Sequence, residues 1–479
     1  MNPVNIGSRR EVFWDDALIE KSRTTAQLKL HRPRIEEIVL VHDAPWEGDG
    51  CNSYSIVKDG DLYRLYYMAW KMLDETGTKH VVTGLHLCYA ESTDGIHWVK
   101  PNLGICEYEG SKENNIILDS GNCEFTDMVH VFIDENPACP PEEKYKAISA
   151  DRPHRPECDR HLACYVSADG IHFKKGWRMT DKGHFDTHNI AFWVPEENQY
   201  IAYIRSFHTG ADTTDAVRDV RWMTSPDFKT WTVPEFLDFD GAEDYALYTN
   251  EVQRYPRAPH MYIGFPTRYM ERKVWTDNVQ QLPNAARRAQ ICKIHSRYGL
   301  TVTDCLFMTS RDGKKFHRFE EPIFTPGIER DRNWFYGDCY PATGMIETKS
   351  ALKYAPDEYS MYCKEKHWSG EPSELRRYTI RKDGFCSMSS GYGESKIYTR
   401  PLVFDGNTLE LNFSTSARGY VYIKLHCQGK TISSCELFGD TLERIVPFDG
   451  DLSEFAGKEV TLEFTLRDAD LYSFRFFNG

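Results

Sequence analysis

The chain has 479 residues, 41% of them hydrophobic and 27% charged, which is ordinary for a soluble globular protein of two or three domains. Its net charge of −14 argues against a nucleic-acid partner, because nucleic-acid binding needs clustered Lys and Arg. No run of about 18 apolar residues occurs, so we expect no membrane span and no membrane partner.

The N-terminus and the cysteines bear on the cellular compartment. The first ten residues lack the apolar stretch of a secretory signal, and the 14 cysteines include no Cys-x-x-Cys pair. We therefore expect free thiols rather than disulfides, no zinc site and a cytoplasmic location. The sequence leaves a homo-oligomer open.

A short turn motif recurs along the chain and gives the first indication of the fold. Its clearest copy reads Ser-Thr-Asp-Gly-Ile-His-Trp at residues 92–98. Three further copies lie at residues 167–173, 225–231 and 310–316, and a degenerate fifth lies at 381–385. Asp-Gly supplies the positive φ angles of a tight hairpin turn, and the Ser and Asp side chains can bond the backbone of the turn. Five copies indicate a repeated antiparallel unit.

Each turn motif follows three short apolar segments that have the composition of β-strands. In the first unit these segments are residues 53–57, 62–70 and 85–90, and the residues after the turn supply a fourth strand. Four strands per unit and five units predict a five-bladed β-propeller over residues 41–394.

The rest of the chain follows a different pattern. Residues 395–479 alternate between apolar and polar side chains, as at Leu409, Leu411 and Phe413, and they lack the turn motif. Such alternation is typical of half-buried strands, so we expect a C-terminal β-sandwich. Residues 1–40 are less regular and are expected to wrap around the propeller or to begin its first blade. The predicted fold class is therefore all-β.

The geometry of a propeller nominates candidate site residues. The first strand of each blade lines the central channel, and the start of strand one and the end of strand two share one face because the strands are antiparallel. Acidic side chains stand at all five starts of strand one: Asp49, Asp127, Asp186, Glu251 and Asp338. The ends of strand two carry, in the same blade order, Trp70, Arg152, Arg205, Arg268 and Lys366.

Carboxylates that converge on one funnel suit glycosidic cleavage, which needs an acid together with a base or nucleophile. Crowding also separates their pKa values, so that one carboxyl can stay protonated near neutral pH. Asp186 is the first candidate, Glu251 the second and Asp49 the third, and Asp127 and Asp338 follow. For each of them taken singly, a structural role as a loop cap is as plausible.

Three further residues are candidates for substrate binding. His188 and Asn189 share a polar cluster with Asp186, and Arg257 lies in a Tyr-Pro-Arg-Ala-Pro-His turn. His188 could bond a sugar or hold a divalent cation such as calcium, although a structural role is favoured and no cofactor is required. Arg257 would contact substrate or, as its turn favours, hold loops together.

The chain resembles the five-bladed propeller glycoside hydrolases of families 32, 43, 68, 117 and 130, and most closely a group of uncharacterised bacterial family-32-like proteins. Four segments carry this resemblance: residues 90–98, 185–189, 255–260 and 467–474. It implies a propeller glycosidase that draws an Asp from blade one, an Asp from blade two and a Glu from blade three. Asp49 and Asp127 match the first two positions, but blade three has Asp186 instead of Glu. The Asn-Asp-Pro-Asn-Gly and Arg-Asp-Pro motifs of invertases are absent, so fructosidase activity is not implied.

The sequence thus predicts a hydrolase of carbohydrate metabolism, a glycosidase that cleaves short glycans or glycosides. Two alternatives stay open. One is a glycoside phosphorylase, in which Arg152, Arg205 and Arg268 would bind inorganic phosphate. The other is a non-catalytic carbohydrate-binding propeller, because a fold alone does not establish activity.

Overall fold

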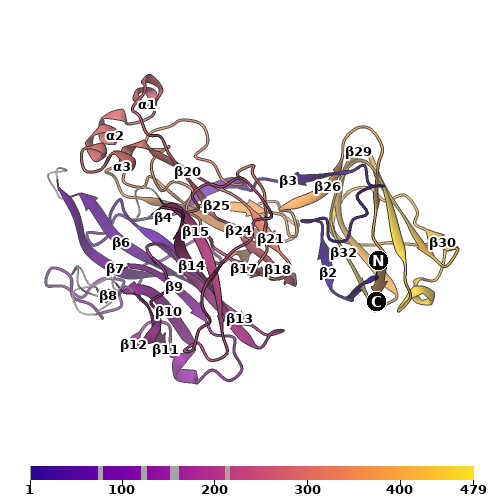
Figure 1. Ribbon diagram of the computed structural model, residues 1–479, viewed down its shortest axis with the longest axis horizontal. Coiled ribbons are helices and arrows are strands. Elements are labelled where there is room, and N and C mark those ends of the chain that lie inside the picture. The colour runs from indigo at the N-terminus through magenta and orange to yellow at the C-terminus, as the bar shows by residue number, and fades with distance from the viewer. Residues whose placement is uncertain (1, 74–78, 120–126, 152–160, 211–215) are drawn as a thin grey trace.

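A computed structural model describes residues 2–73, 79–119, 127–151, 161–210 and 216–479. The chain forms a five-bladed propeller and a smaller β-sandwich, and both chain ends lie in the sandwich (Figure 1). The predicted fold class, a five-bladed propeller followed by a C-terminal sandwich, is confirmed. Three short helices inserted into the fourth blade are the main departure from an all-β chain.

The first three blades are four-stranded antiparallel sheets whose strand order follows the chain. Blade one consists of β5 (Asn52–Asp59), β6 (Leu62–Leu73), β7 (His80–Ser92) and β8 (Ile116–Asp119). Blade two consists of β9 (Asp127–Ile133), β10 (Tyr145–Asp151), β11 (His161–Ser167) and β12 (Lys174–Thr180), with a 3-10 turn at Pro141–Glu143. Blade three consists of β13 (Ile190–Val194), β14 (Gln199–His208), β15 (Val217–Ser225) and β16 (Glu235–Phe236).

Blade four carries an insertion. Its strands are β17 (Gln253–Tyr255), β18 (Ala258–Gly264), β21 (Met308–Ser310) and β22 (His317–Arg318), and the pair β19 (Thr267–Glu271) and β20 (Thr301–Cys305) continues its two middle strands. Between β19 and β20 lie the helices α1 (Asp277–Gln281), α2 (Ala285–Cys292) and α3 (Ser296–Leu300), which project from one end of the propeller (Figure 1). Helix α2 reaches blade five, because Arg287 Nε donates to Trp368 O at 3.0 Å.

Blade five is completed by the N-terminal part of the chain. Its inner strands are β23 (Ile346–Thr348), β24 (Glu358–Glu365) and β25 (Glu374–Ile380), and β4 (Arg34–Val41) pairs with β25 as the outer strand. Because β4 precedes the first blade in sequence, this pairing closes the ring. Earlier strands pair with the sandwich instead: β1 (Val4–Gly7), β2 (Arg10–Val12) and β3 (Gln27–Leu30).

The recurring motif forms the turn between strands three and four of a blade. In the first copy Gly95 N donates to Ser92 Oγ at 2.9 Å, and Asp94 Oδ1 accepts the next two amides at 2.8 Å. The carboxylates of Asp169, Asp227 and Asp312 accept the same pair of amides. In the copy without Gly, Phe228 takes the left-handed conformation at φ 62°, so the turn geometry is kept where its glycine is missing.

Tyrosines tie these turns to the neighbouring blades. Tyr66 of blade one donates to Gly170 O in blade two at 2.9 Å, and Tyr203 of blade three donates to Gly313 O in blade four at 2.8 Å. Tyr362 of blade five bonds Gly95 O in blade one in the same way. The turns therefore fix the contacts between blades as well as the hairpins.

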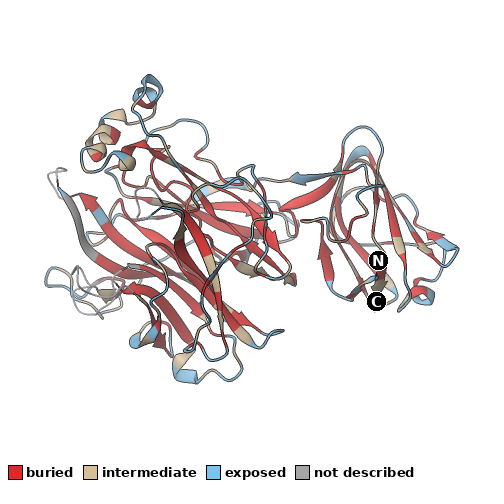
Figure 2. Cartoon of the chain, viewed as in Figure 1, coloured by how far each residue is buried: buried red, intermediate tan, exposed pale blue. Residues whose placement is uncertain are grey.

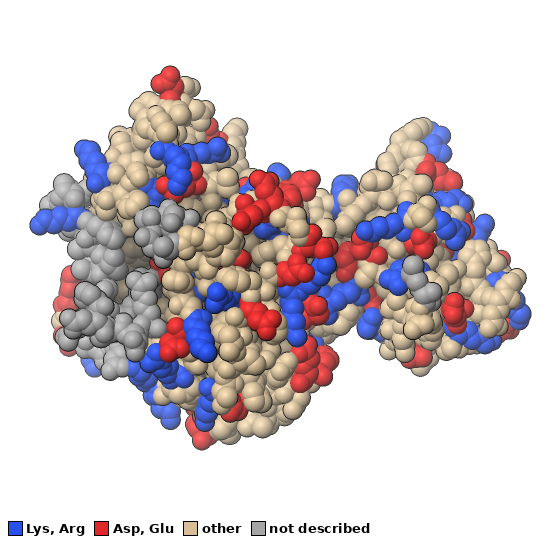
Figure 3. All heavy atoms as spheres, in the orientation of Figure 1, with Lys and Arg blue, Asp and Glu red and all other residues tan. Residues whose placement is uncertain are grey.

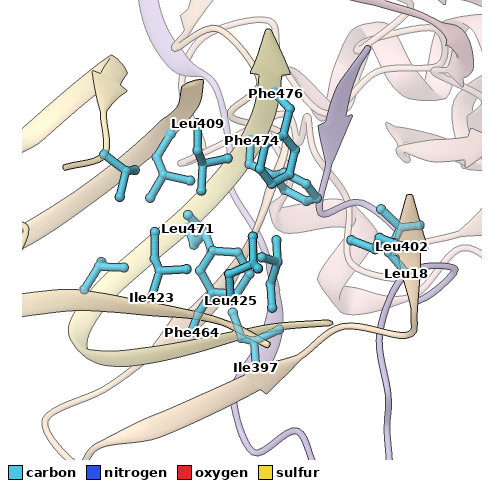
Figure 4. Close-up of a cluster of buried hydrophobic side chains, with 14 of the residues drawn as sticks. Leu18, Ile397, Leu402, Leu409, Ile423, Leu425, Phe464, Leu471, Phe474 and Phe476 are labelled. Carbon is cyan, nitrogen blue, oxygen red and sulfur yellow. The ribbon is translucent and has the colours of Figure 1, made fainter. Parts of the chain in front are cut away.

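Two long strands organise the sandwich, β29 (Thr408–Cys427) and β32 (Thr461–Phe477). Their pairing is interrupted between Thr415 and Tyr420, and side chains from both halves share one core, as Leu409, Ile423 and Phe464 do (Figure 4). The remaining strands are β26 (Cys386–Ser390), β27 (Ser395–Tyr398), β28 (Leu402–Phe404), β30 (Lys430–Ser433) and β31 (Asp440–Ile445), with a 3-10 turn at Leu452–Phe455.

Burial follows this architecture. The strands are buried along most of their length, and exposed residues gather on helices and turns (Figure 2). On the face drawn in Figure 3, acidic and basic side chains are interspersed. Within the described ranges, no helix is long and apolar enough to cross a membrane, and the cysteines are free.

Candidate functional site

The innermost strand of every blade is entered through a residue in the left-handed backbone region. These residues are Ser53, Met128, Phe185, Glu251 and Cys339, with φ between 42° and 65°. Non-glycine residues adopt such angles at a cost, and they concentrate at functional sites. This end of the channel is therefore the place to look for a site.

The five predicted acids occupy different positions relative to this distortion. Asp127 and Asp338 directly precede the left-handed residue, Asp186 follows it, Glu251 is that residue itself, and Asp49 lies four positions before it. Their side chains consequently do not share one environment. The side chain of Asp127 lies outside what the structure describes.

Glu251 lies in a buried polar group at the centre of the channel. His188 Nδ1 is 3.0 Å from Glu251 Oε2, and Thr343 Oγ1 donates to the same carboxylate. His188 Nε2 is 3.3 Å from Ser55 Oγ, which also lies 3.3 Å from His130 Nδ1. These five residues come from five different blades, so Glu251 and His188 help to join the inner strands.

Asp49 is held by three donors at the boundary of blades one and five. Its carboxylate accepts from Met72 N at 3.2 Å, Gly370 N at 3.1 Å and Arg287 Nη2 at 3.0 Å. It lines a cavity of about 470 Å³ together with Lys71 and Arg287. The carboxylate is thus oriented by the inserted helix as well as by the blades.

Asp338 and Lys364 are a pair of buried titratable groups near Asp49. Burial raises the pKa of Asp338 to about 7; Phe335 N donates to its Oδ2 at 3.0 Å, while Oδ1 has no partner among the described residues. Burial lowers the pKa of Lys364 to about 7, against the opposing effect of Asp49 and Asp338. Lys364 Nζ also contacts His367 Nδ1. Groups that titrate near neutral pH are useful for proton transfer.

Asp186 is half-buried beside Arg205. Its main-chain carbonyl accepts from Arg205 Nη1 at 3.0 Å. Burial lowers the pKa of Arg205, and the nearby Tyr248 and Asp186 oppose that shift. Asn189 serves this loop, because its amide bonds Phe185 O and its Oδ1 accepts from Arg205 N. Asn189 therefore acts as a structural support for Asp186 and Arg205.

An aromatic wall extends between Asp186 and Asp49. We use this name for the following six residues: Trp70, Tyr248, Tyr269, Tyr336, Tyr340 and Trp368. Tyr336 stacks on Trp368 with ring centroids 4.4 Å apart, and Tyr248 stacks on Tyr340 at 5.3 Å. Trp70 meets Trp368 edge to face at 5.8 Å, and Trp368 N donates to Asp49 O. The wall thus extends from Tyr248, which is close enough to Asp186 to feel its charge, to Trp368, which bonds the main chain of Asp49.

Several polar atoms of this wall are unsatisfied. The indole Nε1 atoms of Trp70 and Trp368 and the hydroxyl of Tyr269 are buried and have no hydrogen-bond partner in the described part of the chain. Buried donors are nearly always paired in folded proteins, with water or a ligand where the protein supplies nothing. These atoms are therefore available to hydroxyl groups of a bound molecule.

Three other predicted binding residues, Arg268, Lys366 and Arg257, are engaged in ion pairs with residues outside this wall. Arg268 forms a two-pronged ion pair with Asp304, and Lys366 pairs with Glu374. Arg257 follows β17 at the opposite end of the channel and bonds Asp383 and Glu443, so it ties the propeller to the sandwich. Arg152 lies outside the described residues.

The opposite mouth of the channel holds a second cavity of about 520 Å³ lined by residues of all five blades. Its walls are largely apolar, with Phe132, Trp193 and Met345 among them, and His130 and Thr343 of the central group also line it. Within the described ranges, no three His, Cys, Asp or Glu side chains are placed to hold a metal ion.

Sequence reasoning missed four residues near the wall: Arg218, Arg287, Lys364 and Trp368. Arg218 lies at the second position of strand three and Lys364 near the end of strand two, so a search of those two positions for charged residues could have found both. Arg287 belongs to an insertion whose placement no strand pattern predicts.

No family model and no curated protein matches the chain. Solved structures do. A structure described as a glycoside hydrolase is 9% identical and covers 73% of this chain and 92% of its own, with a TM-score of 0.46. The GH32 β-fructofuranosidase of Bombyx mori is 9% identical over 94% and 95% of the two chains, with a TM-score of 0.40. An N-acetylgalactosamine deacetylase from F. plautii, in complex with blood group B trisaccharide, is 12% identical over 74% and 94%, with a TM-score of 0.41. At these identities and TM-scores the likenesses give neither substrate nor catalytic residues.

Proposed function

We propose that the protein is a glycosidase that binds a short glycan or glycoside against the aromatic wall and cleaves it with Asp186 and Asp49. The observation that carries the proposal is the wall itself, with its unsatisfied buried donors at Trp70, Tyr269 and Trp368 between the two carboxylates. Aromatic faces suit the apolar faces of sugar rings, and unpaired donors suit sugar hydroxyl groups.

The two carboxylates differ in ways that suit different roles. Asp49 receives three hydrogen bonds, one of them from Arg287, which hold its carboxylate in the orientation that a base or nucleophile needs. Asp186 is half-buried and accessible at the Tyr248 end of the wall, where it would protonate the leaving oxygen. Asp338 and Lys364 are buried near Asp49 and would exchange protons near neutral pH.

The test is sugar release from a panel of aryl glycosides and oligosaccharides, with and without inorganic phosphate. Wild type should release sugar, and Asp186→Asn and Asp49→Asn should each lose at least about 100-fold in kcat/KM, because general acid or base catalysis contributes that much or more. Dependence on phosphate would indicate a phosphorylase instead of a hydrolase.

Asp181→Asn is the matched control. Asp181 lies on the same loop, is exposed, and pairs only with the exposed Arg178 among the described contacts. It should retain full activity. Full activity of Asp186→Asn would show that the catalytic assignment is wrong, and glycan binding without turnover would favour a carbohydrate-binding propeller.

A further inference from the structure

Two arginines of blade three lie side by side next to Asp186. Arg205 is on β14 and Arg218 on β15, and the strand register pairs Arg205 with Val220 and Phe207 with Arg218. Side chains two residues apart on one strand point to the same face of a sheet. Arg205 and Arg218 are therefore diagonal neighbours on one face of the blade.

Both guanidinium groups are buried, and neither forms an ion pair with a carboxylate of the described residues. Arg205 is 2% exposed and Arg218 is 6% exposed. Among the described residues neither forms an ion pair, and the Nε atom of each has no hydrogen-bond partner. The only described side-chain hydrogen bond of the pair is from Arg205 Nη1 to Asp186 O.

The other buried arginines in the described part of this protein have ion-pair or hydrogen-bond partners. Three of them form ion pairs with glutamates: Arg10 with Glu410, Arg318 with Glu320 and Arg377 with Glu37. Arg288 forms no ion pair within the described ranges but donates to two main-chain carbonyls. A buried charge without such compensation costs several kcal/mol, and a like charge beside it adds to that cost. Among the described residues, the Arg205–Arg218 pair is therefore less compensated than the other buried arginines, with Asp186 as its nearby negative charge.

Aromatic rings orient the two cations without neutralising them. Arg205 lies 4.8 Å from the ring centroid of Tyr248, and Arg218 lies 4.3 Å from that of Tyr269, both in the aromatic wall. Both also lie over Phe207, at 4.9 and 5.8 Å. Stacking holds the plane of a guanidinium and leaves its N–H edge for a hydrogen-bond acceptor. Tyr248 and Phe207 are only partly buried, so the pair lies next to accessible space.

We propose that Arg205 and Arg218 bind an anionic group carried by the substrate, so that the natural substrate is an acidic sugar with a carboxylate, sulfate or phosphate group. That the bound anion belongs to a substrate rests on the proposed function. That the two arginines bind an anion does not depend on it. The pair lies beside Asp186 and against the aromatic wall, so a sugar whose anion is held there would have its ring over the wall. A free phosphate ion as co-substrate would use the same chemistry, and the test separates the two.

Binding is tested first, on the full chain, by thermal stabilisation with sodium D-glucuronate, D-glucose, sodium sulfate and inorganic phosphate at matched ionic strength. Glucuronate should stabilise wild type and glucose should not. Arg218→Met should weaken glucuronate binding about tenfold or more, the range for a hydrogen bond to a charged group. Arg221→Met is the matched control, because Arg221 is on the same strand but stacks on Phe236 at 4.2 Å.

The stability of the unliganded variant separates a binding role from a structural one. A binding arginine without a counter-charge should be replaceable, so Arg218→Met should melt at the same temperature as wild type or above it. A structural arginine would lower the melting temperature. That result, or equal stabilisation by glucuronate and glucose, would overturn the proposal.

Turnover then identifies the source of the anion. Aryl glucuronides should be cleaved at least tenfold faster than the matching aryl glucosides, and Arg218→Met should remove this preference. Stabilisation by phosphate alone, with turnover of neutral sugars that requires phosphate, would overturn the acidic-sugar assignment in favour of a free-anion co-substrate. Cleavage of neutral sugars that is unaffected by Arg218→Met would overturn the inference and leave the glycosidase standing. Anion binding by the protein without any turnover would support the anion site and contradict the proposed glycosidase activity.

Discussion

Asp383 connects the two bodies of the protein, and its neutralisation should uncouple them. Its carboxylate is fully buried at the degenerate fifth turn motif. It accepts hydrogen bonds from four side chains, and Arg10 Nη1 lies 3.5 Å away. The four donors are Tyr255, Arg257, Asn412 and Ser473, at 2.6 to 3.2 Å. The first two belong to the propeller and the other two to the sandwich.

The change Asp383→Asn removes the charge and keeps the shape of the side chain. Breaking a buried ion pair on one side costs about 3–5 kcal/mol, because the partner charge stays buried. In this variant Arg10 still pairs with Glu410 and Arg257 still pairs with Glu443. The expected loss in the free energy of unfolding is therefore near the lower end of this range, at about 3 kcal/mol. The exposed pair of Asp440 with Arg381 lies at the same junction, and Asp440→Asn should cost at most about 1 kcal/mol.

Urea unfolding followed by two probes measures both the loss and the uncoupling. All 11 tryptophans lie between residues 14 and 368, so their fluorescence reports the propeller, whereas far-UV circular dichroism reports the whole chain. The two transitions should coincide in wild type and separate in Asp383→Asn. Arg257 and Arg10 hold the pKa of Asp383 below its usual value despite burial. The difference from the Asn variant should thus be full above about pH 4 and shrink at lower pH, as the wild-type carboxyl becomes protonated. Coincident transitions and a loss no larger than that of Asp440→Asn would refute the reasoning.

Two further predictions concern the blades. Gly313 has φ +70°, and an added Cβ would lie 2.7 Å from Tyr203 Oη, whereas Gly60 has φ +63° and open space around it. Gly60→Ala should lower the free energy of unfolding by about 1–2 kcal/mol, because alanine disfavours the left-handed conformation. Gly313→Ala should lower it by clearly more, as measured by urea unfolding. Equal losses in the two variants would contradict the role of Tyr203 at the turn. Burial raises the pKa of Asp338 to about 7, so the unfolded chain gives up this proton at lower pH than the folded one. As the pH rises from about 4 to about 7, the free energy of unfolding of wild type should therefore fall relative to that of Asp338→Asn, and above about pH 7 the difference should stay constant. A difference that does not change with pH would exclude this titration.

The blades could be predicted because their signal is local. The Ser–Asp–Gly turn forms its bonds within four residues, as Ser92 and Asp94 show, so each copy marks a hairpin wherever it lies. The partner of β4 is β25, more than 300 residues later, and no local pattern specifies that pairing. The same holds for β1 to β3, whose sandwich partners come from the far end of the chain.

The site was less predictable because the direction of a side chain depends on its place relative to the left-handed residue at the entry of each inner strand. Glu251 and Asp338 both stand at the start of strand one, yet Glu251 enters the central polar group and Asp338 accepts the Phe335 amide. The difference of one residue relative to the left-handed position turns the side chain to another neighbour. Sequence spacing alone, which treats all five starts as equivalent, cannot resolve such a shift.

The omission of Arg218 has a similar cause, and it shows what the search should have included. In an antiparallel blade, the end of strand two is paired with the start of strand three, so both lie on the face that carries the start of strand one. Arg205 lies near the end of strand two and Arg218 near the start of strand three of the same blade. Scanning both positions for polar residues would have brought the two arginines together before any coordinates were known. That neither arginine forms an ion pair with a described carboxylate could come only from the structure, and this observation underlies the proposal of an anionic substrate.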